Sequence, residues 1–410
     1  MTGPLALLLD LLTRRRWMVA LVIVMLGVRI LISALLFAAP DGMAVEPFAT
    51  DYSAFFVSGR LAWEGAVAQA YRLEDFLVAQ QRLLGATEFL PWTYPPHFNL
   101  VTAVLALLPI WQGYLVFALL SLVAWLLAVR ALAGAHFGLV LMAMWPAMAV
   151  GLNTGQNGLM FGALMAWLAR AALAAGGSGR AVAGVPLALL TMKPHLLTGV
   201  GLWLLLQRRW RAILVGGVIA LALLALATWL LKPSVWPAFF TAAGRVTLYL
   251  KAGLFPLERM VSLYAGFSRA GFASTPALAL HSVGTLLWLG LLALAWWRGW
   301  PPAQQLAVAL FATLFLTPYA YDYDVPVLGV ALALLAPDLV RRGKPAQIMV
   351  ILLLFWLAGA CGAVFTDQLP DDKAAALALS RQLPALGGFL LHPAGLLLLW
   401  VVRRQSPVAA

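Results

Sequence analysis

The chain has 410 residues, of which 63% are hydrophobic and only 10% are charged. Soluble domains carry about 25% charged residues, so the composition excludes an ordinary water-soluble protein and indicates a membrane protein. The formal net charge is +12, but the basic residues form short clusters between apolar runs and not the continuous basic face that a nucleic-acid partner requires. The single cysteine, Cys361, excludes an internal disulfide.

Four of the basic clusters predict the direction in which each apolar segment crosses the membrane. These clusters, at 14–16, 208–211, 341–344 and 403–404, each adjoin an apolar run. Loops rich in Arg and Lys favour the cytoplasmic side, so we expect all four clusters there. Threading the chain on this basis predicts about 12 transmembrane helices, with both termini in the cytoplasm.

The expected crossings are the apolar runs between these clusters. The segment 181–207 begins and ends beside basic residues, so we expect it to cross twice, with Lys193 and Pro194 at its apex. The short run 98–109 lies between prolines and is expected to form an embedded or re-entrant helix. The remaining expected crossings are 17–39, 113–130, 136–150, 158–174, 212–231, 276–298, 303–317, 325–337, 345–363 and 385–402.

Three longer loops fall on the outer side in this threading. They are 40–97, 232–275 and 364–384. In the first loop, the segments 51–64 and 73–85 mix apolar and charged residues, as helices that lie parallel to a membrane surface do. The sequence therefore predicts an all-α polytopic membrane protein, a single domain over 1–410, with short membrane-parallel helices in its first outer loop.

Most of the unusual polar residues fall on the predicted outer side. They come from five separate stretches, four of which read WTYPPHFN, GLNTGQNG, TMKPHLL and TPYAYDYD. Polar and ionisable residues at membrane depth are costly and tend to mark functional sites, so we expect these stretches to converge on one outward-facing cavity. The residues concerned are Asp51, Tyr94, His97, Asn153, Gln156, Asn157, Lys193, His195, Tyr319, Tyr321, Asp322 and Asp324.

Each stretch also has a local structural explanation, which the sequence leaves open. Asp51 stands at an expected helix start, where a carboxylate interacts favourably with the helix dipole. The polar residues of GLNTGQNG can cap the next helix, and Lys193 can extend its ammonium toward the membrane surface. Asp322 and Asp324 can cap the helix that follows them, and Arg29, inside the first span, can pair with an acid.

The sequence lacks the short motifs of several chemistries. Its five histidines show neither HxxxH nor HExxH spacing and there is no cysteine pair, so no metal cofactor is expected, although a cation held by Asp322 or Asp324 stays open. No GxxxxGK[ST] loop, Gly-rich dinucleotide turn or GxSxG elbow is present. An enzyme without a nucleotide site needs a preactivated substrate, and a lipid-linked substrate suits a membrane cavity.

The order of the polar motifs resembles glycosyltransferase family 87. Asp51 after the first span is followed by YPPH, GQNG, KPH and TPYAYDYD, and the resemblance covers about residues 15–340. Relatives in this family include polyprenol-phosphate-mannose-dependent mannosyltransferases of phosphatidylinositol-mannoside assembly. In those mannosyltransferases the late outer motif contains His, whereas here it reads Tyr321-Asp322-Tyr323-Asp324.

The resemblance implies a fold, a donor and a location. The fold would be the GT-C bundle, in which the first outer loop carries a catalytic Asp and short membrane-parallel helices. The donor would be a polyprenyl-phosphate sugar and not a nucleotide sugar, and no cofactor is expected. The protein would lie among the lipids of a bacterial cytoplasmic membrane, with its active site facing the periplasm or the cell exterior.

The resemblance also implies roles for the polar residues. Asp51 would be the general base of an inverting transfer of mannose or another hexose from polyprenyl phosphate to a lipid or glycan acceptor. Lys193 and His195 are the first candidates to bind the donor phosphate, and Arg245, Lys251 and Arg259 in the second large outer loop are further candidates. We expect the sugar and the acceptor to contact Tyr94, His97, Asn153, Gln156, Asn157, Tyr319, Tyr321, Asp322 and Asp324.

Two other functions stay open on the sequence. A transporter or flippase of a lipid-linked glycan also uses charge inside the membrane, but the inverted repeats with paired broken helices that favour a transporter are not evident. A structural or assembly subunit does not explain why the polar residues cluster on one side. The sequence therefore favours a membrane glycosyltransferase.

Overall fold

The computed structural model describes residues 3–38, 51–85, 87–174, 176, 181–366 and 373–404. Across these ranges the chain folds into helices, with one isolated antiparallel β-bridge between Met260 and Tyr321. The predicted all-α fold is confirmed. Residues 40–50 of the first expected outer loop and 367–372 of the third lie outside the described residues.

The helices follow one another closely along the chain. They are α1 (Pro4–Arg14), α2 (Arg16–Ala38), α3 (Asp51–Trp63), η1 (Val67–Tyr71), α4 (Leu73–Leu84), α5 (Phe98–Leu105), α6 (Ile110–Ala133), η2 (Gly134–His136), α7 (Phe137–Thr154), α8 (Gly158–Leu173), α10 (Gly184–Leu190), η3 (Pro194–Leu197), α11 (Thr198–Leu206), α12 (Trp210–Leu231), α13 (Val235–Lys251), η4 (Leu257–Arg259), α14 (Leu263–Arg269), α15 (Ser274–Trp297), α16 (Pro302–Phe315), η5 (Asp322–Val327), α17 (Leu328–Arg342), α18 (Pro345–Thr366), α19 (Lys373–Ser380) and α20 (Gly387–Arg403). Each expected crossing coincides with one or two of these helices, and α3 and α4 coincide with the two helical segments expected in the first outer loop. Four α-helices of the described chain, α1, α13, α14 and α19, are additional to the predicted elements, as are the short 3-10 helices η1 and η4.

Six helical stretches of the described chain are long and apolar enough to cross a membrane. One of them, Ile110–Thr154, contains α6 and α7, which fold back on each other so that the Tyr114 hydroxyl donates to the Leu152 carbonyl (2.6 Å). The other five are Arg16–Ala38, Trp210–Leu231, Ser274–Trp297, Asp322–Arg342 and Pro345–Gly362. Shorter apolar stretches accompany them at Gly158–Leu173, Pro194–Leu206, Pro302–Phe315 and Gly387–Arg403. The protein is therefore a multi-pass membrane protein.

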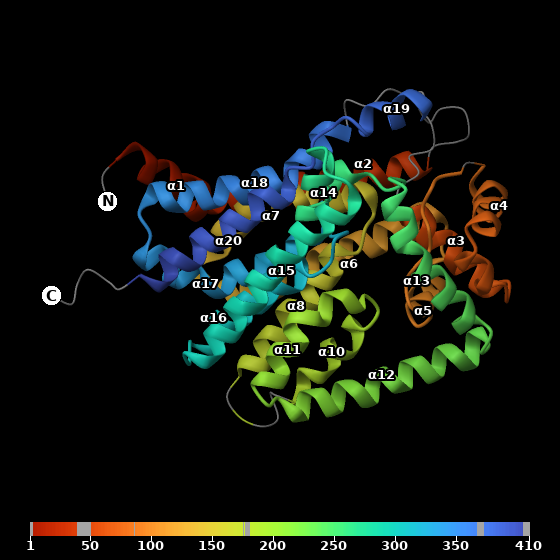
Figure 1. Cartoon of the computed structure of the whole chain (residues 1–410), viewed down its shortest axis with the longest axis horizontal. Helices are drawn as coiled ribbons and strands as arrows, with labels where there is room; N and C mark the ends of the chain where they lie inside the picture. Colours follow the sequence, from red (N-terminus) through yellow and green to blue (C-terminus); the bar gives the residue numbers. More distant parts are fainter. Residues whose placement is uncertain are drawn as a thin grey trace.

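Burial separates the central helices from the peripheral ones. In the stretch that contains α17, 72% of the apolar window is buried inside the protein, whereas in α12 the share is 11%. α12 packs mainly against α10, with a smaller contact to α11, and in Figure 1 it runs along one edge of the molecule. Because an apolar helix with so little protein contact requires another apolar environment, α12 faces lipid on most of its sides.

The segments predicted to be cytoplasmic share one end of the bundle. Gln207, at the end of α11, donates to Gln305 at the start of α16 (2.7 Å). The neighbouring Gln304 donates to Asp338 of α17 (2.9 Å) and accepts from Arg403 of α20 (3.2 Å). In Figure 1, α3, α4, α13 and α19 lie at the opposite end from α1. The predicted grouping of the loops therefore agrees with the structure, and the side of the membrane that each end faces stays a prediction.

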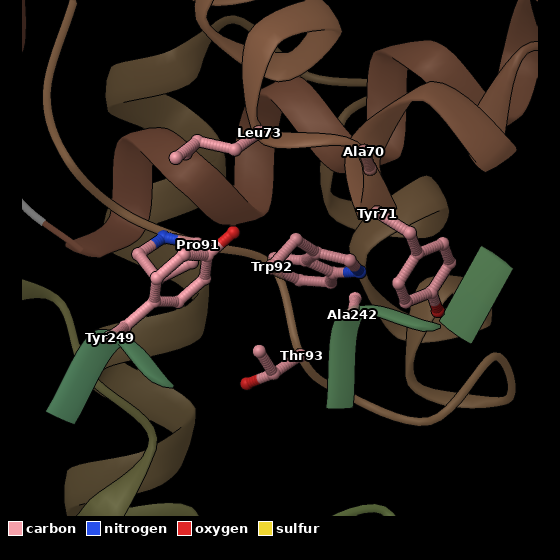
Figure 2. Close-up of a pocket in the computed structure, with 8 residues that line it drawn as sticks. All are labelled: Ala70, Tyr71, Leu73, Pro91, Trp92, Thr93, Ala242 and Tyr249. Carbon is pink, nitrogen blue, oxygen red and sulfur yellow. The ribbon is translucent and has the colours of Figure 1, made fainter. Parts of the chain in front are cut away.

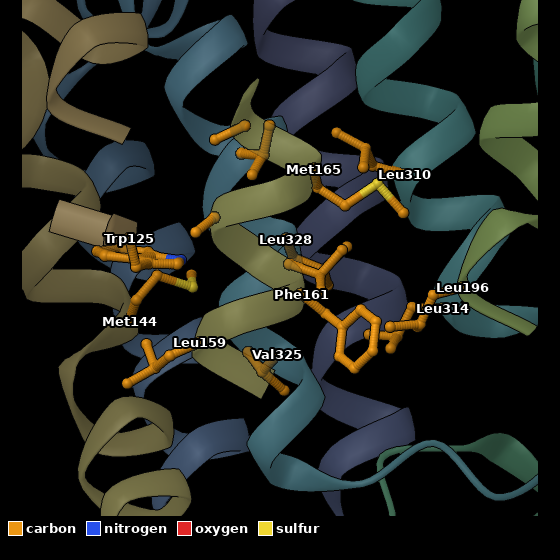
Figure 3. Packing of buried hydrophobic residues seen from close by; sticks show 14 of the residues in the cluster. Trp125, Met144, Leu159, Phe161, Met165, Leu196, Leu310, Leu314, Val325 and Leu328 are labelled. Carbon is orange, nitrogen blue, oxygen red and sulfur yellow. The ribbon is translucent and has the colours of Figure 1, made fainter. Parts of the chain in front are cut away.

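The start of α8 is anchored in the centre of the bundle. Figure 3 shows side chains from several helices around α8, including Trp125 of α6 and Met144 of α7. The Trp125 indole donates to the Pro326 carbonyl of η5 (3.1 Å), and the Phe161 and Leu328 side chains are fully buried. This packing fixes α8 and η5 next to each other, and both elements carry residues of the candidate site.

Candidate active site

Asp51 is the first residue of α3 and faces several of the polar residues predicted from the sequence. Its half-buried carboxylate lies beside the Gln156 side chain and within electrostatic reach of Arg259, Asp322 and Lys193. Burial raises the pKa of the Asp51 carboxyl above its ordinary value of 3.8, while the Arg259 guanidinium acts in the opposite direction. Among the described residues no Lys or Arg forms a direct ion pair with Asp51. Within the described part of the chain, Asp51 is thus a carboxylate without a direct cation partner.

Lys193 forms the first of two buried ion pairs beside Asp51. Its ammonium Nζ lies 2.5 Å from Asp324 Oδ1 and donates to Asn157 Oδ1 at 3.2 Å, and its side chain is 6% exposed. The Asn157 amide in turn donates to the Tyr94 hydroxyl (2.8 Å). A charge at this depth has to be paired and hydrogen-bonded because its desolvation is costly. These contacts join the turn after α10, the start of α8, η5 and the first outer loop.

Asn157 does not act as a helix cap in the usual sense. It occupies the N-cap position of α8, yet its side chain makes no capping hydrogen bond. The side-chain amide is used instead for Tyr94 and Lys193. The capping explanation of this residue is therefore wrong.

Arg259 forms the second buried ion pair. Its Nε and one terminal nitrogen donate to the two carboxylate oxygens of Asp322, at 3.2 and 3.0 Å, in the bidentate geometry that guanidinium groups favour. Asp322 is 1% exposed and also accepts a hydrogen bond from the Tyr323 backbone (2.8 Å). A Cβ added at Gly362 of α18 would stand 2.4 Å from the Asp322 carboxylate, so α18 closes this pair off on one side.

Two tyrosines of the TPYAYDYD motif lie between the ion pairs. The rings of Tyr321 and Tyr323 stack with centroids 5.1 Å apart and an interplanar angle of 9°. Lys193 Nζ lies 5.1 Å from the centroid of the Tyr323 ring, and the Arg259 guanidinium carbon lies 5.8 Å from it. Cations at these distances are attracted by the ring face, so Tyr323 fixes the spacing of the two cations.

The two glycines of GQNG allow the close approach of α7, α8 and η5. Gly155 ends α7 with φ +67, a left-handed conformation that favours glycine. A Cβ at Gly158, the first residue of α8, would stand 1.6 Å from the Tyr323 carbonyl oxygen. Gly158 therefore sets the contact between the start of α8 and the motif that carries Asp322 and Asp324.

A hydrogen-bonded frame holds Tyr94 in place. Ser58 of α3 donates to the Asn99 side chain (2.6 Å), and Asn99 donates to the Tyr71 hydroxyl (2.8 Å). The Tyr71 hydroxyl then donates to the Tyr94 carbonyl (2.9 Å). The Phe55 ring packs edge-on against Tyr94, with centroids 5.7 Å apart. The first outer loop is thus tied to α3, the helix that begins with Asp51.

Several predicted site residues lie outside this group. His97 is 1% exposed and shares a hydrogen bond with Thr191 (3.0 Å), and burial lowers the pKa of its imidazole to about 4. Asn153 accepts a hydrogen bond from Arg29 of α2. Arg245 and Lys251 are exposed on α13, and neither forms an ion pair within the part of the chain that the structure describes.

His195 and Tyr319 lie beside each other, with ring centroids 6.1 Å apart. Two aromatic residues that were absent from the candidate list contact Lys193, namely Tyr323 and Phe161, whose centroid lies 5.7 Å from Nζ. Tyr323 stands inside a motif that the sequence singled out. Phe161 had no such signal, because an aromatic residue in an apolar helix is indistinguishable from a core residue.

Two hollows accompany the site. Figure 2 shows the smaller one, between the first outer loop and α13, lined by Trp92, Tyr71 and Tyr249 among others. Its volume of about 10 Å³ admits a single water and no sugar. The larger hollow, of about 630 Å³, is an apolar groove along α5, α6 and α8, from Val101 and Met160 at one end to Arg170 at the other.

The arrangement suits general-base chemistry beside an anion. It places a carboxylate that is not ion-paired to any described residue among two buried cations, hydrogen-bonding amides and aromatic faces. Among the described residues, no group of three or more His, Cys, Asp or Glu side chains is placed to hold a metal ion. Five chain segments, distant in sequence, contribute to this group: α3, the α7–α8 turn, the turn after α10, η4 and η5.

Comparison with known proteins identifies the family. No curated protein sequence matches this chain. Among solved structures, ArnT from Cupriavidus metallidurans bound to undecaprenyl phosphate is similar over 94% of this chain and 77% of its own, with 13% sequence identity and a TM-score of 0.41. Residues 92–318 match the family described as glycosyltransferase family 87, which is more than half of the chain. The chain belongs to glycosyltransferase family 87, and it is a membrane glycosyltransferase.

Proposed function

We propose that the protein transfers a hexose from a polyprenyl-phosphate donor to a lipid or glycan acceptor on the outer side of a bacterial cytoplasmic membrane, with inversion at the anomeric carbon. The observation that carries this proposal is the position of Asp51. Its carboxylate forms no direct ion pair with any described residue, yet it lies within reach of Arg259 and Lys193. A base and two cations are the groups that displacement of a phosphate by a hydroxyl requires.

In the proposed step, Asp51 takes the proton of the acceptor hydroxyl. The oxygen of that hydroxyl forms a bond to the anomeric carbon while the bond from this carbon to the donor phosphate breaks. The electron pair stays on the phosphate, which is stable as an anion, so no strong acid is needed behind it. One displacement of this kind inverts the anomeric centre, and a β-linked donor gives an α-linked product.

Counting hydrogen-bond donors favours Arg259 as the main phosphate ligand. A guanidinium has five N–H groups, and two of those of Arg259 are used by Asp322, which leaves three. An ammonium has three, and two of those of Lys193 are used by Asp324 and Asn157, which leaves one. Arg259 was a further candidate in the sequence, whereas Lys193 and His195 came first. We propose that Arg259 and Lys193 share the phosphate, with His195 at the edge.

The apolar groove supports a lipid-linked substrate. From Phe117 to Ala131 the groove follows about 21 Å of α6, at a rise of about 1.5 Å per residue. Its end at Met160 lies two residues after Gly158, where α8 meets Tyr323. The sequence also offers no nucleotide-binding motif. A hydrocarbon chain in the groove would bring its headgroup toward Asn157 and Tyr94.

The test uses purified protein reconstituted in lipid nanodiscs. It is incubated with polyprenyl-phosphate mannose, glucose, galactose or arabinose and a membrane-lipid extract, and the products are read by mass spectrometry. We expect one donor to give a new glycosylated product and free polyprenyl phosphate. Translocation of a glycan in proteoliposomes, with no new covalent product from any donor, would favour a transporter and refute the proposal.

The base is tested by Asp51→Asn. Asn serves at a helix start about as well as Asp, so the fold should persist. Its amide, however, cannot act as a base at neutral pH. We expect transfer to fall by about 10²- to 10⁴-fold while binding of polyprenyl phosphate stays within about threefold of wild type. Retention of more than about a tenth of wild-type turnover would leave Asp51 with only its structural role.

A further inference from the structure

Glu258 is a buried acid that the proposed reaction does not use. It stands next to Arg259 in η4 and is 3% exposed. One carboxylate oxygen accepts from Arg269 of α14 (3.0 Å), and the other accepts from the Ser380 hydroxyl at the end of α19 (2.9 Å). Arg269 also donates to the Arg381 backbone carbonyl (2.7 Å). We call Glu258, Arg269, Ser380 and Arg381 the latch.

The latch joins two outer loops that are distant in the sequence. η4 lies in the second outer loop, and Ser380 and Arg381 belong to the third, more than a hundred residues later. The Arg269 side chain is 11% exposed, so the ion pair with Glu258 is shielded from water. A shielded pair of this kind costs desolvation energy that its attraction only partly returns, which makes it a weak stabiliser. Its directional contacts nevertheless define where the η4 backbone sits.

The other side of η4 is tied to the segment that carries Asp322. The residue after Arg259, Met260, forms an antiparallel bridge with Tyr321, and the Val261 amide donates to the Ala320 carbonyl (2.8 Å). Arg259 thus lies between an anchor to η5 on one side and the latch on the other. Without the latch, η4 would still be held by the Met260 bridge, the Asp322 pair and its packing against α18.

We propose that Glu258 is a positioning residue for the donor phosphate: through the latch, the end of the third outer loop holds η4 so that the free N–H groups of Arg259 face the substrate. This inference rests on the proposed function. Glu258 itself is turned toward Arg269 and Ser380, so it acts through Arg259 and touches no reacting atom. When two or three N–H groups must bind one phosphate together, small shifts of the guanidinium weaken the binding.

The experiment measures binding of undecaprenyl phosphate, without a sugar, to the full-length protein in nanodiscs. Glu258→Gln removes the charge pair with Arg269 and retains a carbonyl for Ser380. Arg259→Met removes the phosphate ligand, and the third protein combines both substitutions. Glu64→Gln is the matched control, because Glu64 makes a bidentate pair with Arg82 in the first outer loop, at 3.0 and 2.6 Å, far along the chain from η4.

We expect Glu258→Gln to raise the dissociation constant at least about tenfold, the range expected when a charge-assisted contact is weakened. In the Arg259→Met background the same substitution should have no further effect, because the residue it positions is gone. Glu64→Gln should stay within twofold of wild type. For turnover, Glu258→Gln should raise the KM for the donor more than it lowers kcat.

Several results would overturn the inference. One is an unchanged dissociation constant for undecaprenyl phosphate in Glu258→Gln. Another is that Glu258→Gln weakens binding by the same factor in the wild-type and the Arg259→Met backgrounds. If Glu258→Gln does not fold, Ser380→Ala decides the question, since it deletes one hydrogen bond and keeps the ion pair: a rise of about threefold or more supports the latch, and an unchanged value refutes it. Wild-type protein that fails to bind undecaprenyl phosphate would refute the proposed function and this inference together.

Discussion

Substitution of Gly158 by alanine tests whether the contact between α8 and η5 sets the site geometry. A Cβ at this position would stand 1.6 Å from the Tyr323 carbonyl oxygen, whereas real Cβ contacts do not come closer than 3.0 Å. The difference, 3.0 − 1.6 = 1.4 Å, is the least displacement by which one of the two backbones must move. Tyr323 lies between Asp322 and Asp324, so this displacement reaches both ion pairs.

The expected loss follows from that displacement. Misplacement of catalytic groups by about 1 Å costs about 10²-fold in rate, which corresponds to about 2.7 kcal/mol of barrier. Overpacking at a tight contact lowers the free energy of unfolding by about 1–3 kcal/mol. We therefore expect Gly158→Ala to fold, to unfold at a lower temperature and to lose about 99% of its transfer activity.

The assay compares transfer rate and thermal unfolding in nanodiscs. The matched control is Gly290→Ala in α15, where an added Cβ meets nothing within 4 Å. An alanine at an open helix position is neutral or stabilises by up to about 1 kcal/mol, so this variant should keep full activity. Gly158→Ala with wild-type activity and stability would show that the contact between α8 and η5 does not determine the site.

Three further predictions use other features of the site. Burial raises the pKa of the Asp51 carboxyl, so the active carboxylate is protonated as the pH falls through a value above the ordinary 3.8. We therefore expect kcat/KM to fall on the acidic side with an apparent pKa above 3.8, and an apparent pKa at or below 3.8 would contradict the prediction. Lys193→Met should destabilise the protein by about 3–5 kcal/mol by leaving Asp324 buried without its cation. Adding Asp324→Asn should restore thermal stability but not binding of polyprenyl phosphate, and recovery of binding would exclude Lys193 as a ligand. Lys232 ends α12 with φ 69 and ψ 150, backbone angles that favour glycine and strain a lysine. Lys232→Gly should therefore raise the unfolding temperature, and a lower unfolding temperature would show that the backbone is not strained there.

The transmembrane helices could be predicted from sequence because the bilayer imposes their length. The expected segments 17–39, 212–231 and 276–298 correspond to α2, α12 and α15 within about two residues. α13 could not be predicted in the same way. It lies outside the spanning segments and alternates exposed and buried residues against η1, so no long apolar run marks it.

For the candidate site, the sequence could predict most of its residues but not how they pair. That one site contains Asp51, Gln156, Asn157, Lys193 and residues of TPYAYDYD could be predicted, because polar residues stand out in an apolar chain. Their pairing could not be predicted, since Lys193 and Asp324 are separated by 131 residues and the sequence offers several acids for each cation. For the same reason the sequence placed Arg259 behind Lys193 among the candidate ligands of the donor phosphate.

The separate position of α12 has a consequence for how the protein responds to its membrane. α12 has 22 residues and is therefore about 33 Å long, close to the hydrocarbon thickness of about 30 Å. It packs mainly against α10 and leads at its C-terminal end into α13, which packs on η1 in the first outer loop. In a thinner bilayer such a helix tilts, and its outer end moves relative to the better-buried helices. The distance between Tyr249 of α13 and Trp92 of the first outer loop is thereby coupled to lipid chain length, so that membrane thickness affects the packing at this end of the bundle.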